Sequence, residues 1–316
     1  MPLITMKDIE SLSPIFKGEK GNKTAKRLLR LMGIDRLAKH YEKFEHLSGP
    51  DFVAAYLKDV GVEYQVEGIE NLLSLTDGPF ITVSNHPYGA LDGLILLDLV
   101  GHARSDFKVM ANKFLSMVKT IKDSFISVVP LTDDSKGVSV DSIRGVRSAI
   151  AQLKDGHPLG LFPAGAVSNF HWNDFRIYDR EWQASALRLI QKMKVPVLPI
   201  RFFDRNSTFF YFLGMFGWKV RSMRLPKEIL NKAGREIRVG IGPVISVEEQ
   251  QECANWKDLG IKLREAVYGM DKKCEEYENE SQRSYYEKRV AGVRPFSKRA
   301  LQRQPILRAA NRVDGP

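Results

Sequence analysis

Cysteine is scarce in this chain of 316 residues, which contains only Cys253 and Cys274. Two cysteines cannot build the dense disulfide framework of a small secreted domain, and these two lack the paired spacing of a metal site. The histidines at positions 102, 157 and 171 show no metal-ligand spacing either. The sequence therefore predicts a protein of a reducing compartment with no metal centre.

Long hydrophobic runs are also missing. No uncharged apolar stretch reaches the roughly 18 residues that a membrane-spanning helix needs. The first residues lack the basic-then-apolar pattern of a secretory signal, so we expect a cytoplasmic protein. The most apolar segment, residues 209–218, is rich in aromatic side chains. Two interpretations of this segment remain open: a place in the core, or contact with acyl chains or a bilayer.

The charge is unbalanced, with 48 Lys and Arg against 38 Asp and Glu, a formal net charge of +10. Such an excess implies an acidic partner, either nucleic acid or an anionic membrane surface. No nucleic-acid motif is present, and the basic residues concentrate in the terminal segments rather than on one reading helix. We therefore expect no nucleic-acid partner, but peripheral attachment to the anionic inner face of the cell membrane.

Basic amphipathic helices are predicted over residues 23–60, with a separate helix over residues 51–58 after Pro50. Helices of this kind bind membrane surfaces, but a helix packed on the domain with a solvated basic face has the same pattern. Beyond residue 270 the chain becomes polar and then basic. This extension is either solvated or adheres to anionic lipid.

From residue 62 onward, β-rich and helical stretches alternate. This predicts an α/β fold with a mixed, mostly parallel sheet flanked by helices. We expect strands at residues 64–66, 80–83, 107–110, 127–130, 159–162, 195–200 and 237–241. Helices are expected between them at residues 93–100, 139–154 and 182–194. The chain thus divides into an N-terminal helical segment (1–61), a central α/β domain (62–270) and a basic C-terminal extension (271–316).

One histidine and one carboxylate are forced close together between residues 81 and 93. Residues 81–83 are β-branched and follow a turn, and apolar residues then recur at helical spacing. His86 therefore lies where a strand passes into a helix, a usual place for a site in an α/β fold. Asp92, near the first helical turn, can accept from one imidazole nitrogen and leave the other free as a general base.

Three further segments follow in order: residues 108–131, 161–168 and 195–200. Together with Asn85, His86 and Asp92 they resemble the glycerolipid acyltransferases of the 1-acylglycerol-3-phosphate acyltransferase (PlsC-like) superfamily, and most closely its hemolysin-type bacterial branch. The resemblance covers about residues 62–250, so that the central domain becomes the acyltransferase domain. Each motif alone is weak, but four in order form a stronger signal.

The resemblance implies transfer of a fatty acyl group from acyl carrier protein or coenzyme A to a hydroxyl of a lysolipid in a membrane, without a cofactor. His86 would deprotonate the acceptor hydroxyl, and Asp92 would orient the imidazole. Lys113 could in addition steer the phosphate of the carrier. The substrate-binding residues that the resemblance implies are Asn85, Asn112, Lys113, Phe162, Pro163, Gly165 and Ser168.

Several positions depart from the pattern of the family. Five residues rather than four separate His86 from Asp92. The extra residue lies in a stretch with Gly89, whose freedom to take a positive φ would let the corner bulge. The glutamate and arginine of the family are Ala164 and Val167 here, which can neither accept a hydroxyl proton nor hold a phosphate. Cations elsewhere could replace the arginine, namely Arg144, Arg147, Lys108 or Lys113.

We therefore expect an acceptor other than lysophosphatidic acid. A lyso amino-acid lipid, with a 3-hydroxy fatty acyl group on glycine, ornithine or a similar amine, fits best. Two alternatives stay open: a 1-acylglycerol-3-phosphate acyltransferase that makes phosphatidic acid, and a noncatalytic lipid-binding relative. Ala164 favours the noncatalytic relative, whereas retention of both His86 and Asp92 argues against it.

Overall fold

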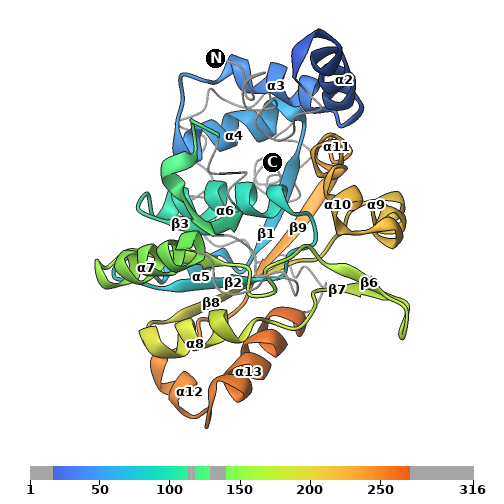
Figure 1. Ribbon diagram of the computed structural model, residues 1–316. Coiled ribbons are helices and arrows are strands. Elements are labelled where there is room, and N and C mark those ends of the chain that lie inside the picture. The colour runs from blue at the N-terminus through green and yellow to red at the C-terminus, as the bar shows by residue number, and fades with distance from the viewer. Residues whose placement is uncertain (1–16, 113–114, 116–117, 129–139, 271–316) are drawn as a thin grey trace, which may run out of the picture.

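The computed structural model describes residues 17–112, 115, 118–128 and 140–270 (Figure 1). The predicted basic extension from residue 271, the beginning of the N-terminal segment and Lys113 lie outside the described residues.

A seven-stranded sheet runs through the described part of the chain. Its strands are β1 (Glu63–Glu67), β2 (Ile81–Ser84), β3 (Lys108–Asn112), β4 (Phe125–Val128), β5 (Leu159–Leu161), β8 (Val197–Phe202) and β9 (Glu236–Ile241). They lie in the order β1-β9-β8-β2-β5-β3-β4. Every neighbouring pair is parallel except β8 and β9, which run antiparallel. The predicted mixed, mostly parallel sheet is therefore confirmed.

Helices cover both faces of this sheet (Figure 1). On one face, α6 (Ala90–Ala103) packs against α4 (Gly49–Val60) and the short α5 (Ile69–Leu73). The other face is covered by a second group of helices, namely α7 (Val140–Lys154), α8 (Ala184–Met193), α12 (Val247–Gln251) and α13 (Trp256–Tyr268). Strand β2 is buried along its whole length, because a parallel strand covered on both faces meets no water. A short 3₁₀ turn, η3 (Lys122–Ser124), precedes β4.

From residue 17 onward, where the structure describes it, the N-terminal segment forms three helices rather than the two that were predicted. The predicted first helix is divided into α2 (Gly18–Leu31) and α3 (Ile34–Lys43). The division falls at Gly33, which has φ +75° and where a Cβ would lie 2.9 Å from Cδ1 of Leu230. A glycine leaves the apolar periodicity around it intact, so the spacing did not reveal this break. Helices α3 and α4 share the core of the sheet, which favours packing for this part of the segment.

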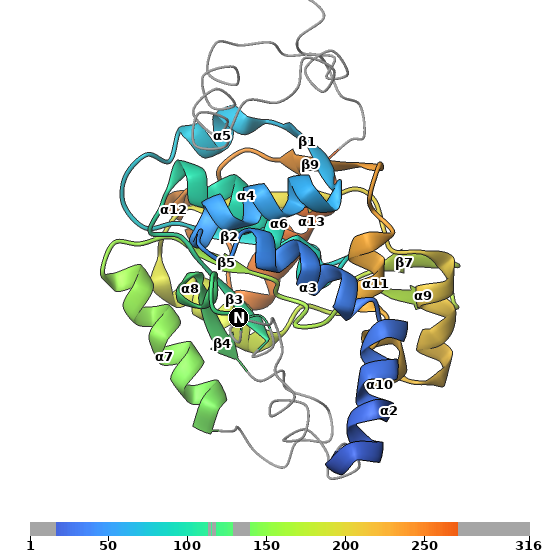
Figure 2. The same cartoon turned by 90° about the horizontal axis from the view of Figure 1, so that it is seen from above.

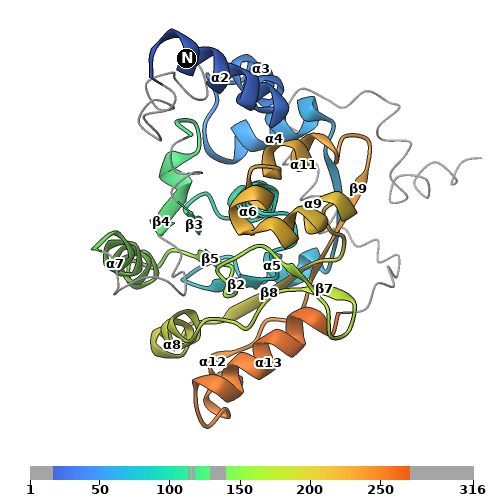
Figure 3. The ribbon, with the colours of Figure 1, turned by 45° about the vertical axis from the view of Figure 1, so that its right-hand side comes forward.

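Two insertions were not predicted. The first is a hairpin of β6 (Asn169–His171) and β7 (Arg176–Tyr178). The second lies between β8 and β9, beside α6 in Figure 3, and consists of α9 (Thr208–Leu213), η4 (Gly214–Phe216), α10 (Trp218–Ser222) and α11 (Leu225–Leu230). Seen from above, α7 and α9 lie at opposite edges of the molecule (Figure 2).

The aromatic segment 209–218 divides between the two environments that the sequence left open. Phe210 and Tyr211 are buried, whereas Phe212 and Phe216 are 49% and 65% exposed. None of the helices in the described part of the chain is both long and apolar enough to cross a membrane.

Candidate active site

The corner between β2 and α6 places both predicted catalytic residues. Gly89, the cap of α6, has φ +83° and ψ −121°, a conformation that only glycine adopts without strain. Oδ2 of Asp92 accepts hydrogen bonds from the backbone N–H groups of Tyr88 and Gly89, both at 2.9 Å. The carboxylate thus closes the corner, and the additional residue between His86 and Asp92 is accommodated at the glycine.

The corner brings His86 and Asp92 together. Nδ1 of His86 lies 2.8 Å from Oδ2 of Asp92, a hydrogen-bonding distance with an angle away from the ideal. Asp92 is fully buried, whereas the His86 side chain is 18% exposed. The imidazole also packs on Phe162, with 4.2 Å between ring centroids. Because Nδ1 is turned to the carboxylate, Nε2 is the nitrogen that remains for a substrate.

The electrostatics of the pair follow from its burial. Loss of water raises the pKa of the Asp92 carboxyl. The His86 ring and the N–H groups of Tyr88 and Gly89 act in the opposite direction, because they stabilise the carboxylate. The two backbone N–H groups and the imidazole therefore offset part of the cost of burying the Asp92 carboxylate.

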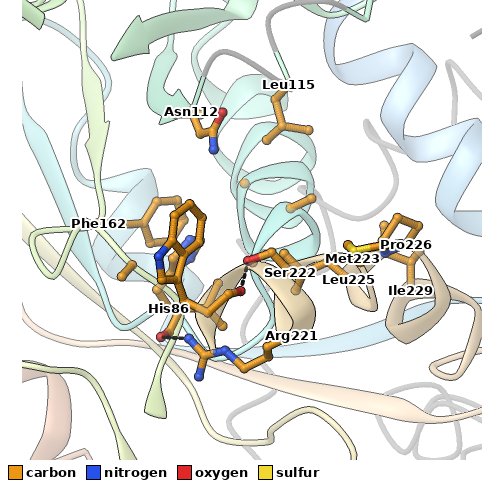
Figure 4. A pocket seen from close by; sticks show the side chains of 18 of the residues that line it. His86, Asn112, Leu115, Phe162, Arg221, Ser222, Met223, Leu225, Pro226 and Ile229 are labelled. Atoms are coloured by element: carbon orange, nitrogen blue, oxygen red, sulfur yellow. Dashed lines mark hydrogen bonds between the residues drawn. The ribbon is translucent and has the colours of Figure 1, made fainter. Parts of the chain in front are cut away.

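His86 lies in the wall of a cavity of about 2130 Å³ (Figure 4). The largely apolar lining comes from α2, α6, β3, the loop after β5 and the insertion α9–α11. In Figure 4, His86 and Phe162 stand on one side of the cavity, and residues from Ser222 to Ile229 stand on the other. An apolar space of this size accommodates a long acyl chain beside the imidazole.

Four of the predicted substrate-binding residues line the same cavity: Asn112, Phe162, Pro163 and Gly165. Two others turn away from it. Both polar ends of the Asn85 side chain pair with the backbone of Phe202 at 2.8 Å. The Ser168 hydroxyl donates to Asp179 at 2.6 Å. These two side chains brace the corner, and the substrate-binding roles of all seven residues, Lys113 included, stay predictions.

Two buried charged residues at the site were missed by the sequence reasoning. Asp179 is fully buried and accepts the backbone N–H of His86 at 3.2 Å. Arg221 is 7% exposed, lines the cavity and donates to the carbonyls of Val167 and Ser168 at 3.2 and 3.1 Å. Asp179 directly follows the unpredicted hairpin β6–β7, and Arg221 lies in α10 of the second unpredicted insertion. Neither residue belongs to a sequence motif, so the sequence offered no local signal for either.

Two arginines contact the loop after β5 at Ala164 and Val167, the positions where the family has its glutamate and arginine. Nε of Arg180 donates to the Ala164 carbonyl at 2.8 Å, and Arg221 reaches the Val167 carbonyl. Both arginines line the cavity. Of the four cations considered from the sequence, Arg147 lines it too. The cavity therefore keeps positive charge beside the loop after β5, although no charged side chain comes from the motif at residues 161–168 itself.

Comparison with known proteins identifies the family. The Acyltransferase family matches residues 23–276, a range that includes the whole sheet, the β2–α6 corner and the cavity wall. The chain belongs to this acyltransferase family, and the predicted resemblance to the glycerolipid acyltransferases is confirmed.

Two similar proteins carry a more particular description, lyso-glycine lipid O-acyltransferase. The protein from Phocaeicola vulgatus is 26% identical over 229 residues, which cover 68% of this chain and 78% of that protein. The protein from Bacteroides thetaiotaomicron is 28% identical over 229 residues, which cover 68% and 80%. Among solved structures, the 1-acyl-sn-glycerophosphate acyltransferase PlsC from Thermotoga maritima aligns with 69% of this chain and 79% of its own, with 19% identity and a TM-score of 0.40.

Proposed function

We propose that this protein is an O-acyltransferase that moves a fatty acyl group from a thioester, on acyl carrier protein or coenzyme A, to the hydroxyl of a lysolipid. The observation that carries the proposal is the His86–Asp92 pair in the wall of a large apolar cavity. The membership of the chain in the acyltransferase family supports the same reaction.

In the proposed reaction, Nε2 of His86 removes the proton of the acceptor hydroxyl while its oxygen attacks the thioester carbonyl. A carbon–oxygen bond forms and the carbon–sulfur bond breaks. The departing thiolate takes the proton back from His86, so the enzyme returns to its starting state. Asp92 keeps Nδ1 protonated and stabilises the imidazolium that forms transiently. No covalent acyl-enzyme is needed.

The acceptor that we propose is a lyso amino-acid lipid, whose free 3-hydroxyl replaces the glycerol hydroxyl. Two relatives described as lyso-glycine lipid O-acyltransferases support glycine as its head group. The local chemistry agrees, since Ala164 and Val167 provide no side chain that could bind a phosphate monoester.

An acyl-transfer assay with purified protein tests both parts of this proposal. The donors are acyl carrier protein and coenzyme A thioesters, and the acceptors are N-(3-hydroxyacyl)glycine and lysophosphatidic acid. We expect faster transfer to the acylglycine. A preference for lysophosphatidic acid would favour the phosphatidic-acid alternative, and lipid binding without transfer from either donor would favour the noncatalytic one.

We also propose that the protein attaches peripherally to the inner face of the membrane. Four exposed apolar side chains line the cavity, namely Trp172, Phe212, Met215 and Trp218, and the exposed Phe216 packs against Phe212; we name these five residues the aromatic rim. Leu28 and Leu29 of α2 and the adjoining Met32 line the cavity, while the lysines and arginines from Lys20 to Arg30 are exposed. Aromatic side chains suit the bilayer interface, and each basic residue near anionic lipid contributes about 1 kcal/mol.

A further inference from the structure

Arg221 carries a buried positive charge for which the described residues provide no carboxylate partner. Its contacts are neutral: the carbonyls of Val167 and Ser168 and the side-chain oxygen of Asn169. The ring of Phe210 lies beneath the guanidinium, with 5.2 Å from Cζ to the ring centroid. A buried cation is costly unless an anion pairs with it. Because Arg221 lines the cavity, a bound ligand can supply that anion.

The hydrogen bonds of Arg221 leave one edge of the guanidinium open. A guanidinium has five N–H groups. Nη1 donates to Ser168 and Asn169, and Nη2 donates once, to Val167. Nε and the second N–H of Nη2 have no acceptor in the part of the chain that the structure describes. Nε and Nη2 form the edge of the fork that holds a carboxylate through two parallel hydrogen bonds.

Tyr211 provides a second donor in the same wall. Its side chain is 7% exposed and lines the cavity. The hydroxyl faces the backbone N–H of Asn206, but its own proton has no acceptor among the described residues. Burial raises the pKa of this hydroxyl, and the charge of Arg221 acts against that rise, as expected for two groups that lie close together. The proton of Tyr211 is therefore retained and can be donated to an anion.

Ser168 connects Arg221 to the catalytic corner. Its backbone N–H donates to the carbonyl of His86 at 2.9 Å, and its own carbonyl accepts from Arg221 at 3.1 Å. Both Arg221 and His86 line the cavity, and Figure 4 labels both residues. An anion on Arg221 would therefore lie within a short span of the hydroxyl that His86 deprotonates.

We infer that Arg221 and Tyr211 form the subsite for the anionic head group of the acceptor, and that this group is a carboxylate. The inference rests on the proposed function. One guanidinium edge and one hydroxyl match the single charge and two oxygens of a carboxylate. A phosphate monoester carries about −1.5 to −2 charges at neutral pH, more than the single charge of Arg221 neutralises.

Calorimetric binding tests the subsite without requiring turnover. The probes are N-(3-hydroxyacyl)glycine and the matching glycinamide, which keeps the hydroxyl and the chain but has no charge. Wild type is expected to bind the carboxylate about 10- to 100-fold more tightly, a usual range for charge-assisted hydrogen bonds. Arg221→Lys and Tyr211→Phe should each lower this ratio severalfold while leaving the affinity for the glycinamide unchanged. Arg224→Lys is the matched control, because Arg224 is already paired with Glu228 at 3.2 Å, and its ratio should remain that of wild type.

Three results would overturn the inference. One is a wild-type protein that binds both probes equally, and another is a carboxylate preference that survives both substitutions. The third is a larger effect of Arg221→Lys on lysophosphatidate than on the acylglycine, which would assign the subsite to a phosphate. Acyl transfer is measured separately, so a protein that binds the acylglycine through Arg221 but transfers nothing would refute the proposed reaction and leave the subsite standing.

Discussion

Asp92 has two tasks in the structure, and both depend on the same oxygen. Oδ2 accepts the N–H groups of Tyr88 and Gly89, which close the β2–α6 corner, and it also lies 2.8 Å from Nδ1 of His86. Fold and proposed chemistry are therefore coupled at one residue. A useful substitution must keep the first task and remove the second.

Asp92→Asn meets this requirement. The amide oxygen can still accept from the backbone, so the melting temperature should stay close to that of wild type. The amide cannot stabilise a protonated His86, so kcat should fall on the order of 10²-fold. Steady-state kinetics and thermal unfolding of the same preparation measure the two effects. Wild-type kcat in the folded variant would show that Asp92 only shapes the corner.

The sequence was sufficient to find His86 and Asp92 because both lie within one local corner, whose strand and helix are marked by β-branched and apolar residues. Arg221 and Tyr211 had no such signal. Their importance comes from their position in a cavity wall, and that position depends on how an insertion after β8 folds back over the loop that follows β5. Only the tertiary structure contains that information.

At the level of elements, the β2–α6 corner is held by Gly89. A Cβ at this position would lie 2.9 Å from Cδ2 of Leu225 and 3.2 Å from Cγ2 of Val167, in a backbone conformation that other residues avoid. The corner, the insertion and the loop after β5 therefore meet at one glycine.

Gly89→Ala should destabilise the fold by about 1–3 kcal/mol, the usual cost of a side chain in a glycine-only conformation. It should also lower acyl transfer, because α6 carries Asp92. Denaturant unfolding and the transfer assay measure these changes. Gly78→Ala is the matched control: its φ is +74° and nothing lies within 4 Å of its Cβ position. It should lose some stability but no activity. Equal loss of activity in both variants would argue against a special role of the corner.

The elements that the sequence predicted well are those with a clear period. The strands and the long helices α6, α7 and α8 were anticipated within a few residues. The hairpin β6–β7 and the helices α5 and α9–α12 were missed, and helices of five or six residues are too short to establish a period. Helix α13, with 13 residues, was also missed, so length does not account for every omission. The break between α2 and α3 at Gly33 was missed for a different reason, because the apolar pattern continues across the glycine.

At the level of the whole molecule, one cavity is lined by four of the five residues of the aromatic rim and by apolar residues of α2, a helix whose basic residues are exposed. The excess of positive charge suggested an anionic surface as the partner. The aromatic rim adds exposed apolar side chains that could contact such a surface as well. The domain boundaries at residues 61 and 270 stay predictions. Helices α3 and α4 nevertheless share the core of the sheet, which favours a first segment that is partly integrated with the second.

Phe216→Ser should weaken binding to anionic vesicles about tenfold, because burial of a phenylalanine side chain contributes about 1.5–3 kcal/mol. Vesicle flotation at several salt concentrations measures this effect and separates it from the salt-sensitive contribution of α2. Ile261→Ser is the matched control, since Ile261 is 58% exposed on α13, away from the aromatic rim. If both variants float like wild type, the rim is not the membrane contact.

The central claim, that His86 is the general base of an acyl transfer, is tested most directly by the single-turnover rate of His86→Ala. The assay uses an acyl carrier protein thioester and N-(3-hydroxyacyl)glycine, with His157→Ala as the matched histidine control, because His157 pairs with Asp106 outside the cavity. We expect His86→Ala to remain folded and to lose about 10²–10⁴-fold in rate, while His157→Ala stays near wild type. A folded His86→Ala protein that transfers the acyl group at the wild-type rate would contradict this account.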